Sequence, residues 1–543
     1  MTRESFLQGA MILALAGLAS RILGAIYRIP LSWVIGDEGL GLYGLAYPIY
    51  NMLLTVSTMG VPLAVCRMIA DRVARGRLGE ARRVTRVSLA FLALSGGFFS
   101  LVLYSSAGFF ARFYHEPRVY LSIIAISPAI FFVSIMAALR GYFQGLQRMT
   151  PTAVSQITEQ IVRVMTMIVL ALVLMPRGLA YAAAGATAGA VAGGLAGLIV
   201  LLVLYWREGG ISDLRDRPKV GDRGRVRPVA PDGRTGARIW PILSELIGLA
   251  IPISITAIIM PLMNMLDAAI VPIRLRAAGI GPAQATALFG QLSQMAFPLV
   301  FMPTSVTSAI SLALVPAVSE AAALGRTAVI RERAALGVRL TVILTMPCVV
   351  GLYLLSSEIP GLLFRQPVAG VSVAALSSGL LFLALQQTAS GVLQGLGRTS
   401  LPLRSLAVGA AVKAVVSWTL TGIPAIGIRG AAFGSVAGFA VASAMNLTTV
   451  ERLVGPLFDW PSALLKPTVA VSAMALAVGW TFHWVASVTT GTNLATVAAI
   501  TAGAVVYTAI LLAIGGMTAR DLEAIPRFGP PLSGFLRRLG LTR

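Results

Sequence analysis

The sequence contains few of the residues that soluble proteins rely on. Charged residues make up only 12% of its 543 positions, whereas 57% are apolar. An ordinary soluble domain has about 25% charged and about 45–50% apolar residues. The chain therefore lacks the polar surface that a water-soluble globule of this size needs, and it is too apolar for a disordered protein.

Cysteine and histidine are also scarce. The chain has two of each, Cys66 and Cys348 with His115 and His483. Two cysteines exclude a disulfide scaffold, and these four residues do not have the spacing of a zinc site. No Walker A sequence and no arguable Ser/His/Asp set is present. We therefore expect no metal and no cofactor.

Long apolar runs take the place of these missing features. The apolar residues number about 310, enough for 14 or 15 membrane helices of about 20 residues each. The first run is expected to be retained, because the segment before Ala14-Leu15-Ala16 is not basic and the run continues past it. The sequence predicts an all-α polytopic membrane protein with about 14 transmembrane helices, at residues 6–29, 43–66, 87–111, 121–143, 152–175, 181–205, 243–270, 287–317, 336–357, 370–393, 403–423, 430–450, 467–487 and 494–516.

The basic residues gather on one side of this arrangement. Of 43 lysines and arginines, 32 fall in loops and termini of one side and seven in those of the other. This asymmetry predicts that both termini are cytoplasmic. The basic loops orient the chain and touch anionic lipid headgroups, so most of the net charge of +22 needs no nucleic-acid partner.

A local pattern recurs about 250 residues along the chain. Because six predicted spans separate the copies, the repeat is parallel and predicts two pseudo-symmetric six-helix lobes. We expect an N-terminal lobe at 1–206, a flexible linker loop at 207–241, a C-terminal lobe at 242–452, two additional helices within 453–516 and a cytoplasmic tail at 517–543. The matching segments are Gly141–Arg148 with Gly391–Arg398, Tyr47-Pro48 with Phe297-Pro298, Ala182–Gly189 with Ala431–Gly438, and Arg163 with Lys413.

Four basic residues remain after the two sides are counted, and all four lie within predicted spans: Arg21, Arg28, Arg163 and Lys413. A charge at the bilayer centre costs about 2.5–3.5 kcal/mol even on lenient scales, so such residues should face a cavity or a partner. Arginine offers a planar fork for a phosphate. These four residues are the predicted substrate-binding cations, although Arg28 could instead extend its side chain to the outer surface.

Acidic and amide residues accompany these cations. Gln156, Glu159 and Arg163 form a polar stripe on one predicted helix, where Glu159 and Arg163 could also be a purely structural pair. Asn264 and Asp267 form a smaller polar spot on another helix. Glu159 and Asp267 are candidates for coupling to a proton or a sodium ion, and Gln156 and Asn264 for further polar positions in the cavity.

Two segments near the N-terminus resemble a known family. They are Ser20-Arg21-Ile-Leu-Gly24-Ala-Ile-Tyr-Arg28-Ile-Pro30 and Gly39-Leu-Gly41-Leu-Tyr43, the latter expected to be an outer turn rather than a dinucleotide site. They are similar to the stage V sporulation protein B group of polysaccharide-biosynthesis membrane proteins, in the multidrug/oligosaccharidyl-lipid/polysaccharide exporter superfamily. The Gln-Gly-Leu-x-Arg segments at 144–148 and 394–398 agree with this.

The resemblance implies an activity. It implies a cationic central cavity that binds the pyrophosphate of an undecaprenyl-linked sugar, with Arg21 in the place of the first-helix arginine of lipid II flippases. The leading hypothesis is a flippase that moves a lipid-linked oligosaccharide to the outer leaflet of a bacterial plasma membrane by alternating access. Because such a step makes and breaks no bond, we expect a protein that is not an enzyme. The alternatives are a cation-coupled drug exporter of the same superfamily and a non-transporting membrane scaffold in envelope or spore assembly.

Overall fold

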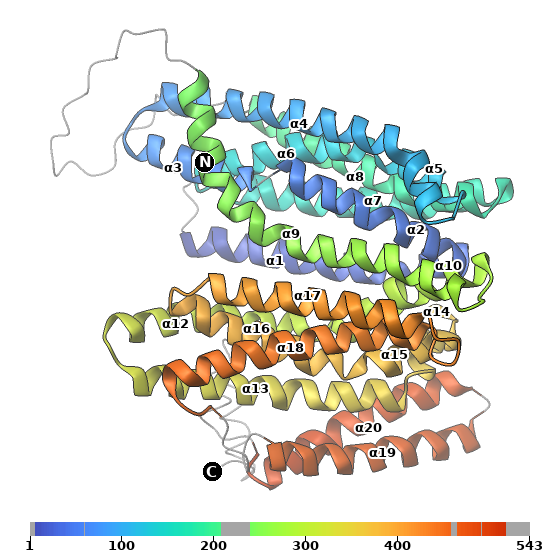
Figure 1. Cartoon of the computed structure of the whole chain (residues 1–543). Coiled ribbons are helices and arrows are strands. Elements are labelled where there is room, and N and C mark those ends of the chain that lie inside the picture. The colour runs from blue at the N-terminus through green and yellow to red at the C-terminus, as the bar shows by residue number, and fades with distance from the viewer. Residues whose placement is uncertain (1–5, 59, 208–238, 458–463, 490, 517–543) are drawn as a thin grey trace. The chain divides into compact units, whose positions relative to one another are not determined.

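Helices account for nearly all of the described chain. The computed structural model describes residues 6–58, 60–207, 239–457, 464–489 and 491–516, without the side chains of residues 6–10, 14, 18, 21, 25 and 252–256. Within these ranges the helices are joined by short turns and no strand occurs (Figure 1). The predicted all-α architecture is confirmed. Most of the expected linker at 207–241 and the expected tail at 517–543 lie outside the described residues.

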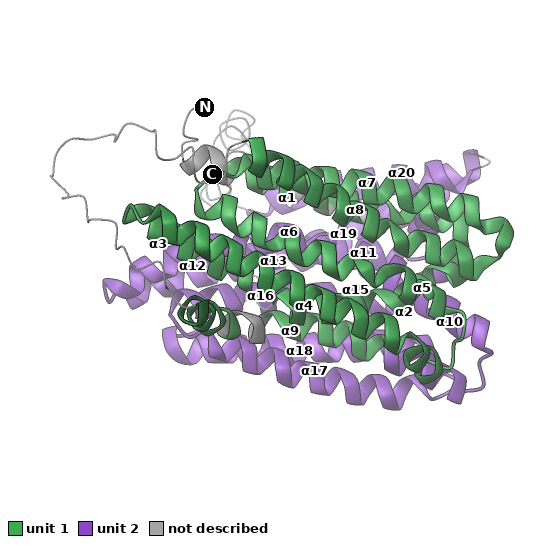
Figure 2. Cartoon of the chain, turned by 90° about the horizontal axis from the view of Figure 1, so that it is seen from above, with its two compact units in different colours: residues 1–268 green, residues 269–543 purple. Residues whose placement is uncertain are grey.

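The chain divides into two compact units, residues 1–268 and 269–543 (Figure 2). The helices of the first unit are α1 (Phe6–Ile26), α2 (Arg28–Thr58), α3 (Val61–Ala74), α4 (Leu78–Phe113), α5 (Val119–Ile126), α6 (Pro128–Gly145), α7 (Thr150–Leu174), the short 3₁₀ turn η1 (Met175–Arg177), α8 (Leu179–Arg207) and most of α9 (Ile239–Ala277).

The second unit begins within the last residues of α9. It continues with α10 (Pro282–Gly290), the π-helical segment η3 (Gln291–Ala296), α11 (Phe297–Phe301), α12 (Thr304–Ala323), α13 (Thr327–Leu354), α14 (Glu358–Phe364), the 3₁₀ turn η4 (Pro367–Ala369), α15 (Gly370–Ser377), α16 (Gly379–Gly395), α17 (Ser400–Thr421), α18 (Ile428–Val454), α19 (Lys466–Val488) and α20 (Thr492–Ala513). The pair α19 and α20 forms the two additional helices expected near the C-terminus.

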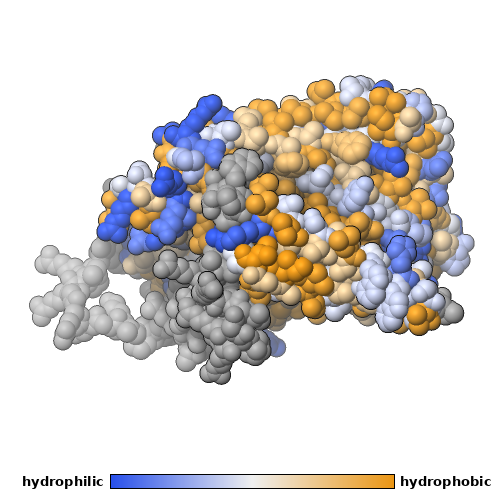
Figure 3. All heavy atoms as spheres, turned by 90° about the horizontal axis from the view of Figure 1, so that it is seen from below, coloured by the Kyte–Doolittle hydropathy of each residue, from blue (hydrophilic) through white to orange (hydrophobic). Residues whose placement is uncertain are grey.

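The number of membrane crossings agrees with the predicted count. Among the described residues, 12 helical stretches are long and apolar enough to cross a membrane, or 13 if the bent pair Pro367–Ser377 and Gly379–Gly395 is one span. One of the 12, Met11–Ala74, has 64 residues and would be about 96 Å long as a straight helix, far more than a bilayer of about 30 Å. Counting it as two crossings, and the bent pair as one more, gives 14. Large apolar side chains such as Leu94, Leu312 and Leu476 are correspondingly exposed, and apolar residues cover much of the surface in Figure 3.

The turn within Met11–Ala74 lies at Gly36. This residue has φ 66° and ψ −171°, a backbone conformation that side chains disfavour, and it interrupts α2. The expectation of a turn at Gly39–Gly44 was wrong, because these residues are helical and buried. A Cβ atom on Gly39 would lie 3.0 Å from the Leu179 side chain, so this glycine serves close packing instead.

Repeated glycines pack the same helices together in both units. A Cβ on Gly141 of α6 would lie 2.5 Å from the Pro62 carbonyl oxygen of α3, and one on Gly391 of α16 would lie 2.6 Å from the Ser311 carbonyl oxygen of α12. Gly145 and Gly395 approach α3 and α12 in the same way one turn later. The repeated Gly-x-x-Gln-Gly sequence is therefore a helix-packing motif, which supports the predicted internal repeat.

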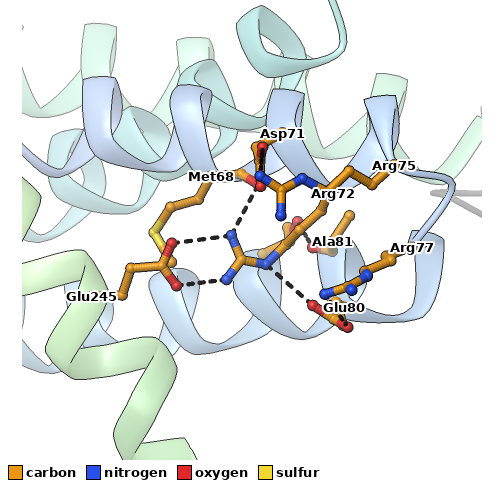
Figure 4. A network of polar contacts seen from close by, with 9 residues as sticks. Met68, Asp71, Arg72, Arg75, Arg77, Glu80, Ala81 and Glu245 are labelled. Carbon is orange, nitrogen blue, oxygen red and sulfur yellow. Dashed lines mark hydrogen bonds and ion pairs between the residues drawn. The ribbon is translucent and has the colours of Figure 1, made fainter. Parts of the chain in front are cut away.

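A bidentate ion pair fastens the start of α9 to α3. The Arg72 guanidinium donates to both carboxylate oxygens of Glu245, at 3.3 and 2.6 Å, and also to the Met68 carbonyl oxygen (Figure 4). Its Nε lies 3.7 Å from a carboxylate oxygen of Glu80 on α4. One arginine thus joins three helices at the end of the first unit where the basic turn between α3 and α4 lies.

Candidate functional site

Glycines of α8 determine how α7 presents its polar side chains. A Cβ on Gly193 would lie 2.7 Å from the Glu159 carbonyl oxygen and 2.8 Å from the Arg163 Cβ. A Cβ on Gly189 would likewise lie 2.8 Å from the Arg163 carbonyl oxygen. Because α8 lies directly on the backbone of α7 here, the longer side chains of Glu159 and Arg163 extend toward the neighbouring helices α2 and α6.

Glu159 binds two arginines at once. Its Oε1 accepts a hydrogen bond from Arg163 Nη2 at 2.5 Å, and its Oε2 accepts one from Arg140 Nη2 at 2.8 Å. The Arg140 Nη2 also donates to Ser155 Oγ at 3.2 Å. The side chains of Glu159, Arg163 and Arg140 are 8%, 12% and 20% exposed, so the group is largely shielded from solvent. The predicted Glu159–Arg163 pair exists, but within a larger cluster that carries a net positive charge.

Arg140 is the site residue that the sequence analysis missed. Because Arg140 lies close to the end of the predicted span 121–143, the sequence assigns it to the 32 basic residues of the cytoplasmic side. A long side chain at that depth can reach the headgroups, so hydropathy alone does not reveal which way it points. The structure directs it inward to Glu159 and Ser155 instead.

Tyrosines of α2 extend the cluster from Arg163 toward Arg28. Arg163 Nη1 donates to the Tyr47 hydroxyl at 3.3 Å, and the Tyr47 ring stacks on Tyr43 with centroids 5.1 Å apart. The hydroxyls of Tyr43 and Tyr27 are 3.0 Å apart, and the Arg28 guanidinium lies 5.0 Å from the Tyr27 ring centroid. Arg28, the first residue of α2, also donates a hydrogen bond from Nη1 to the Gly24 carbonyl oxygen of α1 at 2.5 Å.

The three arginines lie at different depths. With a rise of about 1.5 Å per residue, Arg140 is about 8 Å from the end of α6, and Arg163 is about 20 Å from the start of α7 on the same side. Arg28 lies about 12 Å from the turn at Gly36, which is at the opposite end. The first unit therefore carries guanidinium groups near one side, near the middle and toward the other side.

The second unit repeats the central pair in simpler form. Lys413 of α17 is buried, and its ammonium lies 5.4 Å from the ring centroid of Phe297. Arg163 with Tyr47 and Lys413 with Phe297 occupy matching repeat positions, so each unit places a cation beside an aromatic ring. The positions that match Arg140 and Glu159 hold Ser390 and Gly409.

A neutral network occupies the place of Arg140 in the second unit. Gln386 Nε2 and Asn446 Nδ2 both donate to Ser390 Oγ, at 3.1 and 3.0 Å, and all three residues are buried. The charged cluster of the first unit is therefore not a requirement of the repeated fold.

Among the described residues, the hydrogen bonds of the cluster do not include Gln156 or Asn264. Gln156 is half-buried on α7, Asn264 is exposed on α9, and Asp267 is buried on α9. The Arg21 side chain lies outside the described residues, although its helix α1 packs along α7. The part of the chain that the structure describes contains no group of three His, Cys, Asp or Glu residues that could hold a metal ion.

A separate ion-pair cluster lies between α4 and α5. Arg118 donates to Glu116 at 2.7 Å and to Glu38 of α2 at 2.6 Å. The hydrogen bond to Glu116, followed by that to Glu38, raises the pKa of Arg118 against the opposing effect of burial, so this side chain stays charged. The cluster connects the turn after α4 to the part of α2 that follows the interruption at Gly36.

The resemblance predicted from the sequence is confirmed by comparison with known proteins. A family model described as polysaccharide biosynthesis protein matches residues 6–223. Stage V sporulation protein B of Bacillus subtilis (strain 168) is 28% identical over 84% of this chain and 85% of its own. Lipid II flippase MurJ of the same strain is 27% identical over 88% of this chain and 87% of its own.

A solved structure shares the fold. Lipid II flippase MurJ in an inward closed conformation matches 97% of this chain and 99% of its own length, with a TM-score of 0.67 and 14% identity. The chain is therefore a multi-pass membrane protein with the fold of a flippase. The similarity to lipid II flippase MurJ in sequence, together with the shared fold, supports a membrane flippase or transporter.

Proposed function

We propose that this protein is a flippase for an undecaprenyl-pyrophosphate-linked oligosaccharide, a lipid II-like cell-wall precursor or a polysaccharide unit. It moves this lipid from the inner to the outer leaflet of the bacterial plasma membrane by alternating access, with both termini in the cytoplasm. The two compact units correspond in this proposal to the two lobes of the transport cycle.

The observation that carries the proposal is the guanidinium cluster of the first unit. Arg140 and Arg163 are shielded from solvent at two depths, and Arg28 lies at a third. Buried guanidinium groups suit a pyrophosphate, because each can donate two parallel hydrogen bonds to phosphate oxygens. Arg21 and Lys413 are proposed to add positive charge. Among the described residues, a Cβ on Gly17 or Gly24 of α1 would meet nothing within 4 Å, so this face of α1 leaves room for a bulky group.

The same cluster disfavours a cation-coupled drug exporter. An exporter of that kind needs a carboxylate that can bind and release a cation. In the first unit, the buried carboxylates of Glu159 and Glu116 are each held by arginine. Asp267 stays a proposal for a coupling site of the flippase, with a proton or sodium ion as the coupled species. Glu159, the second candidate, would have to leave its two arginines before it could bind that ion.

A flipping assay tests the proposed function. Purified protein would be reconstituted in vesicles with fluorescent lipid II and with other undecaprenyl-pyrophosphate oligosaccharides, and the probe that reaches the opposite leaflet would be measured. We expect Arg163→Ala to slow flipping at least tenfold, because it removes the guanidinium in the middle of the cluster.

Arg112→Ala is the matched control. It also removes one positive charge, but Arg112 is at the exposed end of α4 and its Nε bonds to the Gly108 carbonyl oxygen of its own helix. This variant should flip lipid at the wild-type rate. The proposal would be overturned if wild-type protein moved none of the pyrophosphate lipids, or if Arg163→Ala moved them as fast as wild type.

A further inference from the structure

Glu159 holds the same guanidinium atoms that a phosphate would use. A carboxylate and a phosphate both present oxygen acceptors to the planar fork of arginine. Glu159 gives one oxygen to Arg163 and the other to Arg140, and thereby bridges two helices as a pyrophosphate could. Both carboxylate oxygens are in use.

The two arginines have donors left over. Among the described residues, the Nε–H groups of Arg140 and Arg163 are buried and have no hydrogen-bond acceptor. A buried donor without an acceptor is costly, and the two oxygens of Glu159 leave these two donors unsatisfied. A pyrophosphate has more terminal oxygens than a carboxylate, so it could replace Glu159 and also satisfy the remaining donors.

Neutral partners would keep the arginines in place after Glu159 moved away. Ser155 Oγ holds Arg140 and donates to the Gly197 carbonyl oxygen at 3.1 Å, while the Tyr47 hydroxyl holds Arg163. The guanidinium groups would therefore stay close to their present positions while the carboxylate is exchanged for the ligand.

The fold does not need this carboxylate. The second unit builds the matching helices α16 and α17 with Ser390, Gly409 and Lys413 in place of Arg140, Glu159 and Arg163. Of these three matched positions, only the one on α7 and α17 carries a positive charge in both units. The acid and its second arginine are thus an addition of the first unit.

We propose that Glu159 is a built-in competitor for the anionic headgroup. It neutralises Arg140 and Arg163 in the empty site, yields them to the pyrophosphate on binding, and returns to promote release. This inference rests on the proposed function, since it concerns the affinity of the same site for the same ligand. In this role Glu159 sets the position of the two arginines and the affinity for the headgroup, and the proposal does not require it to couple transport to an ion as well.

Binding and flipping measured on the full chain test this role. The probe is farnesyl pyrophosphate, which carries the pyrophosphate on a short chain, and farnesol serves as the uncharged comparison. We expect Glu159→Gln to bind farnesyl pyrophosphate about tenfold tighter than wild type and to flip lipid II more slowly, because release becomes difficult. Farnesol binding should not change. A purely structural carboxylate would give the opposite result, with weaker binding.

Glu116→Gln is the matched control, because it also removes a buried carboxylate that is paired with an arginine, at the α4–α5 turn. It should leave pyrophosphate affinity unchanged. If Glu159→Gln does not fold, the same binding measurement is made on Glu159→Asp. The shorter acid cannot reach both arginines and should give an intermediate gain in affinity.

The outcomes separate the two proposals. If wild-type protein does not bind farnesyl pyrophosphate, the proposed function itself falls. If wild type binds the probe and folded Glu159→Gln or Glu159→Asp binds it no more tightly, only the competitor role is overturned.

Discussion

The Tyr47 hydroxyl distinguishes the two central cations of the repeat. In the first unit it accepts a hydrogen bond from Arg163, whereas the matching Phe297 offers Lys413 only its ring. A guanidinium has five N–H donors and an ammonium has three, so a buried guanidinium needs more acceptors. The aromatic ring is therefore the shared element, and the hydroxyl is specific to arginine.

Tyr47→Phe should weaken the first unit modestly. The ring contacts with Tyr43 and Tyr50 remain, but Arg163 loses one acceptor, so we expect a loss of about 1 kcal/mol in the free energy of unfolding. The measurement is denaturant or thermal unfolding of purified protein in detergent. Tyr50→Phe is the control, since no hydrogen bond of the Tyr50 hydroxyl joins the cluster within the part of the chain that the structure describes. An equal loss in both variants would show that the Tyr47 hydroxyl has no special role.

The residues of the site could be predicted only in part. Arg163, Glu159 and Lys413 stood out because a charge within an apolar run is costly wherever it points. Arg140 did not, because its side chain could reach either the headgroups or the interior from the same position. The tyrosines of α2 were also missed, since an aromatic residue in a membrane helix is common and its hydroxyl partner depends on packing between distant helices.

Helix packing shows why the repeat was detectable. Gly141 and Gly145 on α6 match Gly391 and Gly395 on α16, and in each case a Cβ would collide with a carbonyl oxygen of the facing helix. Such positions accept only glycine, so both copies retain it. Turn positions follow the same logic, because Gly76 and Gly325 both have positive φ at the end of matching helices.

Gly141→Ala should destabilise the protein clearly. The added Cβ would lie 2.5 Å from the Pro62 carbonyl oxygen and 3.1 Å from the Val65 Cβ, and backbone atoms cannot rotate away. We expect a loss of about 1–3 kcal/mol, measured by unfolding in detergent. Gly108→Ala in α4 is the matched control, since a Cβ there meets nothing within 4 Å and alanine favours a helix. Equal stability of Gly141→Ala and wild type would refute the close-packing role.

Helix interruptions were harder to predict than helices. Matching helical stretches of the two units are interrupted at different places. In the first unit, Gly60 separates α2 from α3, and in the second, Pro303 separates α11 from α12. The matching residues near each break are helical in the other unit. Gly60 has φ 65°, whereas Pro303 ends α11 by excluding a backbone donor, so two unrelated causes act on one repeated element. A repeat in the sequence predicts the helices but does not predict where they bend.

The turn at Gly36 decides on which side of the membrane every later turn lies. If the N-terminus is cytoplasmic and Met11–Ala74 crosses twice, the turn between α3 and α4 and the turn between α12 and α13 are cytoplasmic. The turn between α9 and α10 is then on the outside. If the segment crossed only once, every later turn would change sides, and the positive-inside asymmetry would point the wrong way.

Cysteine labelling of intact bacterial cells tests this topology. In a background with Cys66 and Cys348 replaced by alanine, Gly79→Cys, Thr327→Cys, Gly281→Cys and Gly491→Cys each place a thiol at an exposed position. A membrane-impermeant maleimide should react with the cysteines at 281 and 491 in intact cells, and with those at 79 and 327 only after permeabilisation. Labelling at 79 from outside would contradict the turn at Gly36. Labelling at 79 and 327 on different sides would contradict the parallel repeat, because an even number of crossings must separate its two copies.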